Sequence, residues 1–229
     1  MKLYSGPLSL FARKIEIALG EKGLAYQRVM VPFTQEAGYS PKHPDVLAAN
    51  PKGQVPVLVD GDLTLFDSTL IFEYLEDAHP APPLYPVGAK PRASCRLIEL
   101  AADEILLPMV RALMFRNSPV DPDPARQAAL VAEAARAERA IRDYYAGLEA
   151  RLAGRDYFCD VFTVADIAMF MTVLFVLRLR GPGLDGFPAL AAWYARVGAR
   201  PAAAKVAAEI AAADRELSPL ARTASPLGA

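Results

Sequence analysis

A proline-rich segment divides the sequence into two parts with different secondary-structure patterns. The segment between Pro80 and Pro91 reads PAPPLYPVGAKP, which is too rich in proline for the interior of a helix or a strand. Before it, short strand-like runs alternate with helical periodicity, and after it only helical periodicity recurs. The sequence therefore predicts a mixed α/β domain over 1–80, a linker over 81–90, an all-helical domain over 91–217 and a loose tail over 218–229.

Within the first domain, the patterns predict the element order β-α-β-α-β-β-α. The expected strands cover 2–4 and 26–31 and form a hairpin over 55–66, and the expected helices cover 10–22, 41–49 and 69–78. In the second domain, helices are expected over 92–116, 124–152, 163–180, 187–200 and 201–217. The first of these five should be kinked at Pro108, because proline removes a helical hydrogen bond.

Composition excludes several classes of partner. The chain has 229 residues, 53% of them hydrophobic, and a formal net charge of −1, so no basic excess favours nucleic acid or anionic lipid. The longest apolar run, over 167–177, is well short of the ~20 residues that a membrane-spanning helix needs. The N-terminus lacks the apolar core of a signal peptide, and the two cysteines, Cys95 and Cys159, form no metal or redox motif. We therefore expect a cytoplasmic protein without metal, nucleic-acid or membrane partners.

The hairpin combines a strand-like run with a proline at its entrance. Val55, Val57 and Val59 alternate as one face of a strand, before a turn at Asp60-Gly61-Asp62. Pro56 cannot donate to a sheet ladder, and it pushes the preceding residue towards an extended conformation. The amide and carbonyl of Val55 are therefore expected to be free to pair with another extended chain, such as a peptide ligand.

The start of the helix over 163–180 carries a capping signal. Thr163 and Asp166 stand three positions apart, in the order typical of a capping box, and Phe162 and Ile167 can form a hydrophobic staple across it. This pattern predicts a helix start and does not bear on function.

Three motifs in this order resemble the cytosolic glutathione transferase superfamily. They are LYSGPLSLFARKIEIAL at the N-terminus, GQVPVL followed by FDS, and FTVADI downstream. The resemblance extends from Lys2 to about Leu217. Within the superfamily, the chain is most similar to bacterial serine-type, theta- or phi-like members. It implies an α+β fold, with a thioredoxin-like N-terminal domain followed by an all-α helical bundle.

The resemblance also implies a peptide-binding site for glutathione. In the family, the proline that matches Pro56 is cis, and the residue that matches Val55 pairs its backbone with the cysteinyl part of glutathione. The acidic-serine pair that matches Asp67 and Ser68 grips the γ-glutamyl end, and many relatives have Glu where this chain has the shorter Asp67. Without the resemblance, Ser68 is read as a helix N-cap, Asp67 as its solvated neighbour and Pro56 as an edge marker.

Two more residues fit as ligands for the peptide. Gln54 precedes Val55, and Lys42 stands eight residues before Asn50, the spacing at which plant transferases keep a lysine for the glycyl carboxylate. The alternative for Lys42 is a solvated lysine in a loop.

Ser9 is the predicted catalytic residue. Glutathione transfer needs a thiolate, and a hydrogen-bond donor at a helix N-terminus lowers the pKa of the thiol. Ser9 stands where serine-type relatives keep their activating serine, whereas Ser5 lies nearer the place of the tyrosine in tyrosine-type relatives. The alternative for Ser9 is a plain N-cap. The absence of a cysteine in this loop argues against the cysteine-type omega, beta and lambda relatives and against maleylacetoacetate isomerases.

The implied activity is addition of the glutathione thiolate to a small apolar electrophile, in a detoxification role. Four residues offer an apolar wall for that electrophile, although packing in the core is the alternative for most of them: Met109, Leu113, Met114 and Phe115. Two other functions remain open: a glutathione-dependent disulfide reductase or peroxidase, and a non-catalytic binding or regulatory module. The resemblance further implies a two-fold homodimer, with glutathione as co-substrate and no metal.

Overall fold

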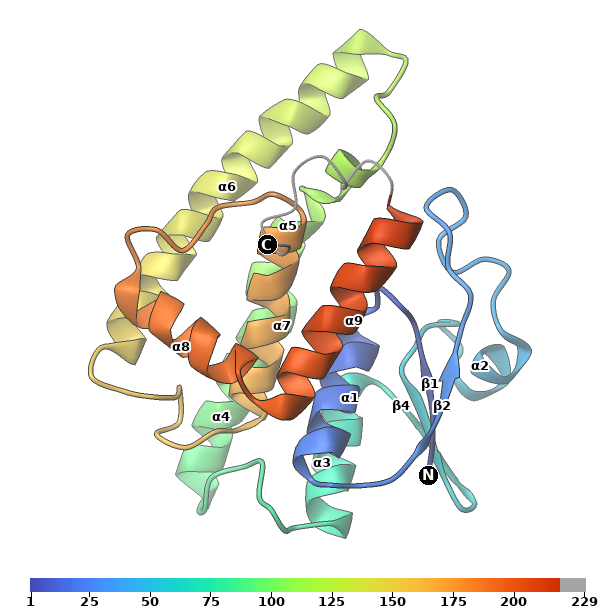
Figure 1. Cartoon of the computed structure of the whole chain (residues 1–229), viewed down its shortest axis with the longest axis vertical. Coiled ribbons are helices and arrows are strands. Elements are labelled where there is room, and N and C mark those ends of the chain that lie inside the picture. The colour runs from blue at the N-terminus through green and yellow to red at the C-terminus, as the bar shows by residue number, and fades with distance from the viewer. Residues whose placement is uncertain (219–229) are drawn as a thin grey trace. The chain divides into compact units, whose positions relative to one another are not determined.

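The structure is a computed structural model that describes residues 1–218, which form two compact units (Figure 1). The first unit comprises Met1–Tyr85 and Arg200–Leu217, and the second comprises Pro86–Ala199 and Ser218. The last helix of the chain thus groups by contact with the first unit, although the sequence analysis assigned it to the second domain by chain order. The tail expected over 218–229 lies outside the described residues, apart from Ser218.

A four-stranded mixed sheet forms the centre of the first unit, in the order β2-β1-β3-β4. Strand β1 (Lys2–Ser5) pairs in parallel with β2 (Gln27–Met30) and antiparallel with β3 (Val57–Asp60), and β3 pairs antiparallel with β4 (Leu63–Phe66). The predicted order of strands and helices in this part is confirmed. The central strands β1 and β3 bury Leu3, Tyr4, Val57 and Leu58, and this apolar burial stabilises the sheet.

Helices lie on both faces of this sheet. Figure 1 shows α1 (Leu10–Glu21), α3 (Ser68–Ala78) and α9 (Pro201–Leu217) on one face and the short α2 (Pro44–Ala49) on the other. Helix α1 packs against both α3 and α9. A Cβ atom at Gly20 of α1 would lie 2.8 Å from the Cβ of Ala202, so glycine allows the close approach of α9 at this point.

Charged side chains hold α9 to the rest of the first unit. The guanidinium of Arg13, which is buried on α1, donates to Glu16 at 2.9 Å and to Glu209 of α9 at 2.7 Å. Arg28 of β2 donates to the same two carboxylates. Burial alone would raise the pKa of Glu209, but the hydrogen bonds from Arg28 and Arg13 together lower it. Ion pairing therefore fixes the position of α9, in addition to apolar packing.

The second unit consists of helices. They are α4 (Ala89–Ala101), a π-helical turn η1 (Ala102–Leu106), α5 (Leu107–Arg111), a 3₁₀ turn η2 (Met114–Asn117), α6 (Pro124–Leu152), α7 (Val164–Arg178) and α8 (Pro188–Gly198). The helix expected over 92–116 is therefore interrupted rather than only kinked. Pro108 explains the break, because its ring clashes with the carbonyl one turn earlier and the π-helical turn relieves this clash.

Helix α7 is the core of the second unit, as its apolar sequence predicts, and it packs against α4, α5 and α8. Its predicted capping box is present, with the Thr163 amide donating to Asp166 Oδ2 at 2.9 Å. Asp166 is fully buried and also accepts from Trp193 Nε1 at 2.8 Å and from the Phe158 amide at 3.2 Å. One carboxylate thus ties the start of α7 to α8 and to the preceding loop.

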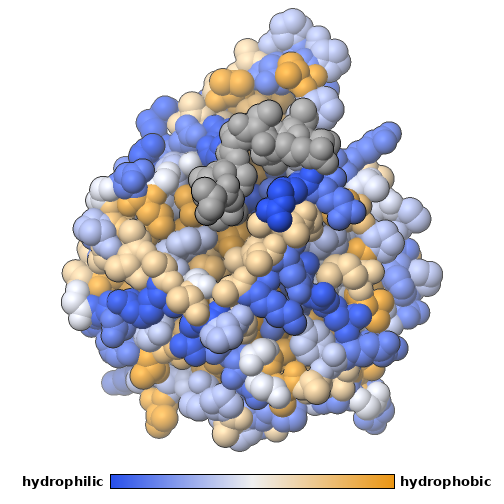
Figure 2. All heavy atoms as spheres, viewed as in Figure 1, coloured by the Kyte–Doolittle hydropathy of each residue, from blue (hydrophilic) through white to orange (hydrophobic). Residues whose placement is uncertain are grey.

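The surface mixes polar and apolar residues. Figure 2 shows hydrophilic and hydrophobic side chains interspersed over the face in view. No helix within residues 1–218 combines the length and the apolar character needed to cross a membrane.

Candidate functional site

Three segments of the first unit meet at one end of its sheet. Tyr4 of β1, Val57 of β3 and Phe66 of β4 are direct cross-strand neighbours. Because β3 runs antiparallel to β1 and β4, the end of β1, the start of β3 and the end of β4 lie at the same edge. The loop after β1, the residues before β3 and the start of α3 therefore converge there, and we call this edge the β3-entry end.

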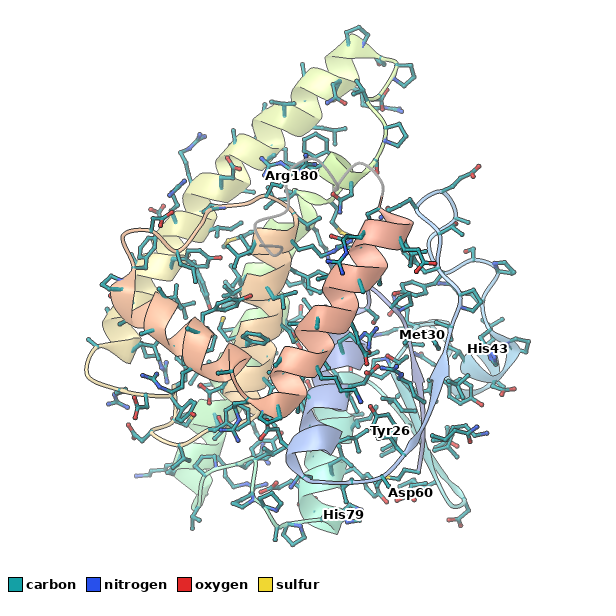
Figure 3. All side chains as sticks on the ribbon, in the orientation of Figure 1. Tyr26, Met30, His43, Asp60, His79 and Arg180 are labelled. Carbon is teal, nitrogen blue, oxygen red and sulfur yellow. The ribbon has the colours of Figure 1, made fainter. Side chains whose placement is uncertain are left out.

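The β2 strand and α2 mark the same edge in Figure 3. Met30, the last residue of β2, and His43, at the start of α2, lie towards the β3-entry end. Tyr26, just before β2, and Asp60, the last residue of β3, lie towards the opposite end. All of the predicted peptide ligands belong to segments at the β3-entry end, within a single compact unit.

The peptide bond between Val55 and Pro56 is cis, as the resemblance implies. Strand β3 begins only at Val57, and the amide and carbonyl of Val55 make no backbone hydrogen bond to any residue in 1–218. The side chain of Val55 packs against the cluster around Tyr4 and Val46, which fixes the position of its backbone. The backbone at Val55 therefore presents a donor and an acceptor that an extended peptide can use.

Asp67 caps α3 in a strained conformation. Its φ is 78° and its ψ is 128°, a combination that residues other than glycine rarely adopt. Its Oδ1 accepts from the amides of Thr69 at 3.0 Å and Leu70 at 3.4 Å. Ser68, buried, is the first residue of the helix. The cap is thus Asp67 itself rather than Ser68, and the helix begins one residue earlier than the sequence analysis proposed.

Lys42 and Gln54 lie on neighbouring segments. The Gln54 carbonyl accepts from the buried Asn50 side chain at 2.7 Å, and the Gln54 side chain is exposed. A Cβ at Gly53 would lie 3.4 Å from Lys42 Cγ, so the lysine stem covers this glycine. Lys42 is exposed. Lys42 therefore lies against Gly53, the residue that precedes Gln54.

Ser9 is the N-cap of α1. Its Oγ accepts from the Ala12 amide at 3.3 Å, and the side chain is half-buried. A serine hydroxyl has one donor and two acceptor sites, so this cap leaves its proton available to a ligand. Capping and thiol activation are therefore compatible at Ser9.

Ser5, the alternative candidate, is committed elsewhere. It is fully buried, and its hydroxyl donates to Oε1 of the buried Glu16. That carboxylate is the one held by Arg13 and Arg28. Ser5 therefore acts as an internal link between β1 and α1 and has no proton to spare for a sulfur atom.

Tyr39 is a site residue that the sequence analysis missed. Its hydroxyl accepts from the Leu8 amide at 3.1 Å, and its ring covers Gly6, where a Cβ would lie 2.5 Å from ring atoms. Phe33 supports the ring, with centroids 4.8 Å apart. Tyr39 thus holds the loop that carries Ser9. The only local signal for it is Gly6, the small residue that its ring requires, and nothing in the sequence spacing links the two.

The residues proposed as a hydrophobic wall lie in the second unit and differ in burial. Leu113 is buried in the core, whereas Met114 is exposed and Met109 half-buried. Phe115 lines a surface pocket of about 340 Å³ together with Arg116, Ser118, Pro119, Val120, Gln127 and Arg180. Arg180, which is labelled in Figure 3, follows the end of α7 and is one of the residues that line this pocket. No group of three or more His, Cys, Asp or Glu side chains within residues 1–218 is arranged to hold a metal ion.

Comparisons with known proteins identify the family of the chain. The family model for the glutathione S-transferase N-terminal domain matches residues 3–83, and that for the C-terminal domain matches residues 100–201. Glutathione S-transferase 3 from Zea mays is 35% identical over 92% of this chain and 94% of its own length. A glutathione S-transferase from Methylobacterium radiotolerans, solved with glutathione sulfonate, is 29% identical over 90% of this chain and 93% of its own, with a TM-score of 0.73.

A second group of relatives matches only in part. The stringent starvation protein A homolog of Coxiella burnetii is 41% identical over 43% of this chain, and the match spans 44% of that relative's length. The chain thus spans less than half the length of the first curated relatives that it matches. The full-length match to the Zea mays protein and the two matched domains nevertheless identify the family. The chain belongs to the glutathione S-transferase family.

Proposed function

We propose that the protein binds glutathione at the β3-entry end and activates its thiol as a nucleophile. The observation that carries the proposal is the convergence of three features at this end. The first is the Ser9 hydroxyl, whose proton is available to donate to a ligand. The second is the backbone of Val55 next to Pro56, which forms no backbone hydrogen bond. The third is the N-terminus of α3, which is capped by Asp67 in a strained conformation. Backbone strain in an otherwise regular unit is typical of functional sites.

Each part of the tripeptide then has a partner. The cysteinyl residue pairs with the backbone of Val55 as an added strand. The γ-glutamyl carboxylate meets Ser68 and the α3 N-terminus, where amide groups and the helix dipole favour an anion. The γ-glutamyl ammonium meets the Asp67 carboxylate, and the glycyl carboxylate meets Lys42 and Gln54.

Ser9 supplies the chemistry. A free thiol with a pKa near 8.5 is mostly protonated at neutral pH. A hydrogen bond to a charged group contributes about 1.5–3 kcal/mol, and 1.36 kcal/mol corresponds to one pKa unit. Donation from Ser9 to the sulfur therefore lowers the thiol pKa by about one to two units, enough for a large thiolate fraction.

The proposed reaction is attack of this thiolate on an electrophilic carbon of a small apolar molecule. A carbon–sulfur bond forms, and the leaving group departs with its electron pair, or a proton is taken up where the thiolate adds to a double bond. The serine-type, theta- or phi-like class follows from Ser9 and from the absence of a cysteine in its loop.

A second candidate is a binding or regulatory module without catalysis. The partial matches to stringent starvation protein A homologs favour it, because they concern nearly half of this chain at 34–41% identity.

A glutathione-dependent disulfide reductase or peroxidase also uses the proposed thiolate, but with a disulfide or peroxide as its acceptor. We further propose a homodimer in the cytoplasm, as in other family members, which sedimentation analysis would test.

The test compares wild type with Ser9→Ala and Ser9→Thr. Turnover is measured with glutathione and an aryl halide, and separately with a mixed disulfide or a hydroperoxide. We expect wild type and Ser9→Thr to conjugate the halide and Ser9→Ala to lose most of this activity. Turnover of only the disulfide or peroxide would support the reductase, and no turnover of any acceptor would support the binding module. Thermal unfolding of each variant separates loss of the cap, about 1 kcal/mol, from loss of chemistry.

A further inference from the structure

A buried arginine attaches the loop that carries Ser9 to α1. The Ser9 amide donates to the Gly6 carbonyl at 3.2 Å, which closes a tight turn that contains Pro7. The Pro7 carbonyl accepts from two nitrogen atoms of Arg13, from Nη2 at 3.3 Å and from Nε at 3.4 Å. Arg13 thus reaches back from the start of α1 to the turn that precedes the helix.

Carboxylates fix the other edge of the Arg13 guanidinium. Its Nη1 donates to Glu16 at 2.9 Å and to Glu209 of α9 at 2.7 Å, and Arg13 is only 2% exposed. A guanidinium is planar and presents its donors in a rigid fork, so partners on two edges fix the plane of the group. The Pro7 carbonyl at one edge is therefore held in a defined position relative to the carboxylates at the other.

The same ion-pair network also holds the end of the strand that leads into the loop. The Ser5 hydroxyl, at the end of β1, donates to Oε1 of Glu16, and Oε2 of Glu16 accepts from Arg13 at 2.9 Å. Ser5 and Pro7 are separated by a single residue, so the loop is attached to one buried network at two neighbouring points. The position of the Ser9 hydroxyl therefore depends on this network.

We propose that Arg13 is a positioning residue for thiol activation, and that Glu209 links the last helix of the chain to the Ser9 hydroxyl through Arg13. This inference rests on the proposed glutathione site. A hydroxyl donates to a sulfur atom only within hydrogen-bond distance, and a displacement of about 1 Å in an active site can cost about 100-fold in rate. Arg13 acts through the Pro7 carbonyl rather than on the sulfur atom, and the turn that ends at Ser9 moves with this carbonyl.

A second ion pair between α1 and α9 provides a matched control. Helix α9 packs along α1 (Figure 1), and Nε of Arg200, just before α9, donates to Glu21 at 3.1 Å. Glu21 is the last residue of α1, whereas Ser9 caps the opposite end of this helix. Both ion pairs attach α9 to α1, but only the pair with Glu209 continues to the loop. Removal of either carboxylate should lower stability, whereas only removal of Glu209 should affect the bound thiol.

The experiment measures the thiol pKa of reduced glutathione bound to the full-length protein, from the ultraviolet thiolate band as a function of pH. Lysine keeps the charge of arginine but lacks the fork, so Arg13→Lys should raise the pKa of the bound thiol by about one unit. Glu209→Gln should raise this pKa by a smaller amount, because Glu16 still holds Arg13. The dissociation constant of glutathione should stay nearly constant in both variants, and Glu21→Gln should keep the wild-type pKa.

Hydrogen exchange of the free proteins tests the position of the loop without glutathione. The amides of Leu8 and Ser9 should exchange faster in Arg13→Lys and Glu209→Gln than in wild type, and at the wild-type rate in Glu21→Gln.

Two kinds of failure are distinguishable. If wild type forms a thiolate that Ser9→Ala loses, but Arg13→Lys and Glu209→Gln keep the wild-type thiol pKa, the positioning role is overturned and the proposed function stands. If wild type forms no thiolate, or Ser9→Ala retains it, the activation by Ser9 is overturned together with this inference. Glu209 is partly exposed, so Glu209→Gln decides the outcome even where Arg13→Lys does not fold.

Discussion

The hydrogen-bond cluster around Asp166 predicts a large loss of stability when this carboxylate is removed. Asp166 accepts from Trp193 Nε1 at 2.8 Å, from the Thr163 amide at 2.9 Å and from the Phe158 amide at 3.2 Å, and it is fully buried. Asp166→Ala leaves these three donors without a partner. Each unsatisfied buried donor costs about 1–3 kcal/mol, and relief from the buried charge offsets part of the sum. We expect a net loss of about 3–5 kcal/mol in the free energy of unfolding of the second unit.

The chain provides its own reporter for this experiment. Trp193 is the single tryptophan and donates directly to Asp166, so its fluorescence follows unfolding of the second unit during a urea or heat titration. For a domain of about 100 residues, the expected loss lowers the midpoint temperature by roughly 15 °C or more.

Two variants make the comparison specific. Asp166→Asn keeps one oxygen acceptor in nearly the same shape, so it should lose clearly less stability than Asp166→Ala. Asp143→Ala removes an exposed carboxylate from α6 and should change stability by no more than about 0.5 kcal/mol. If Asp166→Ala unfolds within 1 kcal/mol of wild type by the same probe, the reasoning about buried donors is wrong.

Three further predictions concern the first unit. Tyr39→Phe removes the acceptor for the Leu8 amide, a hydrogen bond worth about 1 kcal/mol. This variant should lower kcat for conjugation several-fold while Tm falls little, and an unchanged kcat would refute the positioning role of Tyr39. Asp67→Asn keeps the helix cap but removes the charge, so calorimetry should record about 10- to 100-fold weaker glutathione binding at nearly constant Tm. The pKa of Glu209 is lowered from 4.5, so its stabilising contribution is present above its unfolded-state pKa and is lost as the pH falls through its folded-state pKa. Glu209→Gln should therefore flatten the loss of stability below about pH 4.5, whereas an unchanged acid profile would show that its pairing with Arg13 is unimportant.

Local patterns predicted most of the fold. The hairpin over 55–66 and the capping box at Thr163 follow from a few adjacent residues, so the sequence alone specified them. The interruption before Pro108 was predicted only as a kink, because sequence does not show how a helix relieves a proline clash. Asp67 was expected beside the cap rather than as the cap, because its positive φ has no signal in a residue other than glycine.

Long-range contacts could not be predicted from patterns in the sequence. The positioning role of Tyr39 depends on how a loop folds back over Gly6. The position of α9 within the first unit likewise depends on ion pairs between distant segments, in which Glu209 pairs with Arg13 and Arg28. Side chains that come into contact only after folding produce no periodic pattern in the sequence.

The most direct test of thiol activation by Ser9 is a titration of wild type, Ser9→Ala and Ser9→Thr with reduced glutathione. Calorimetry measures binding, and an ultraviolet difference spectrum measures the thiolate. We expect that all three proteins bind glutathione and that only wild type and Ser9→Thr show the thiolate band at neutral pH. An equal thiolate band in Ser9→Ala would contradict activation by Ser9, and no binding by wild type would contradict the proposed glutathione site as a whole.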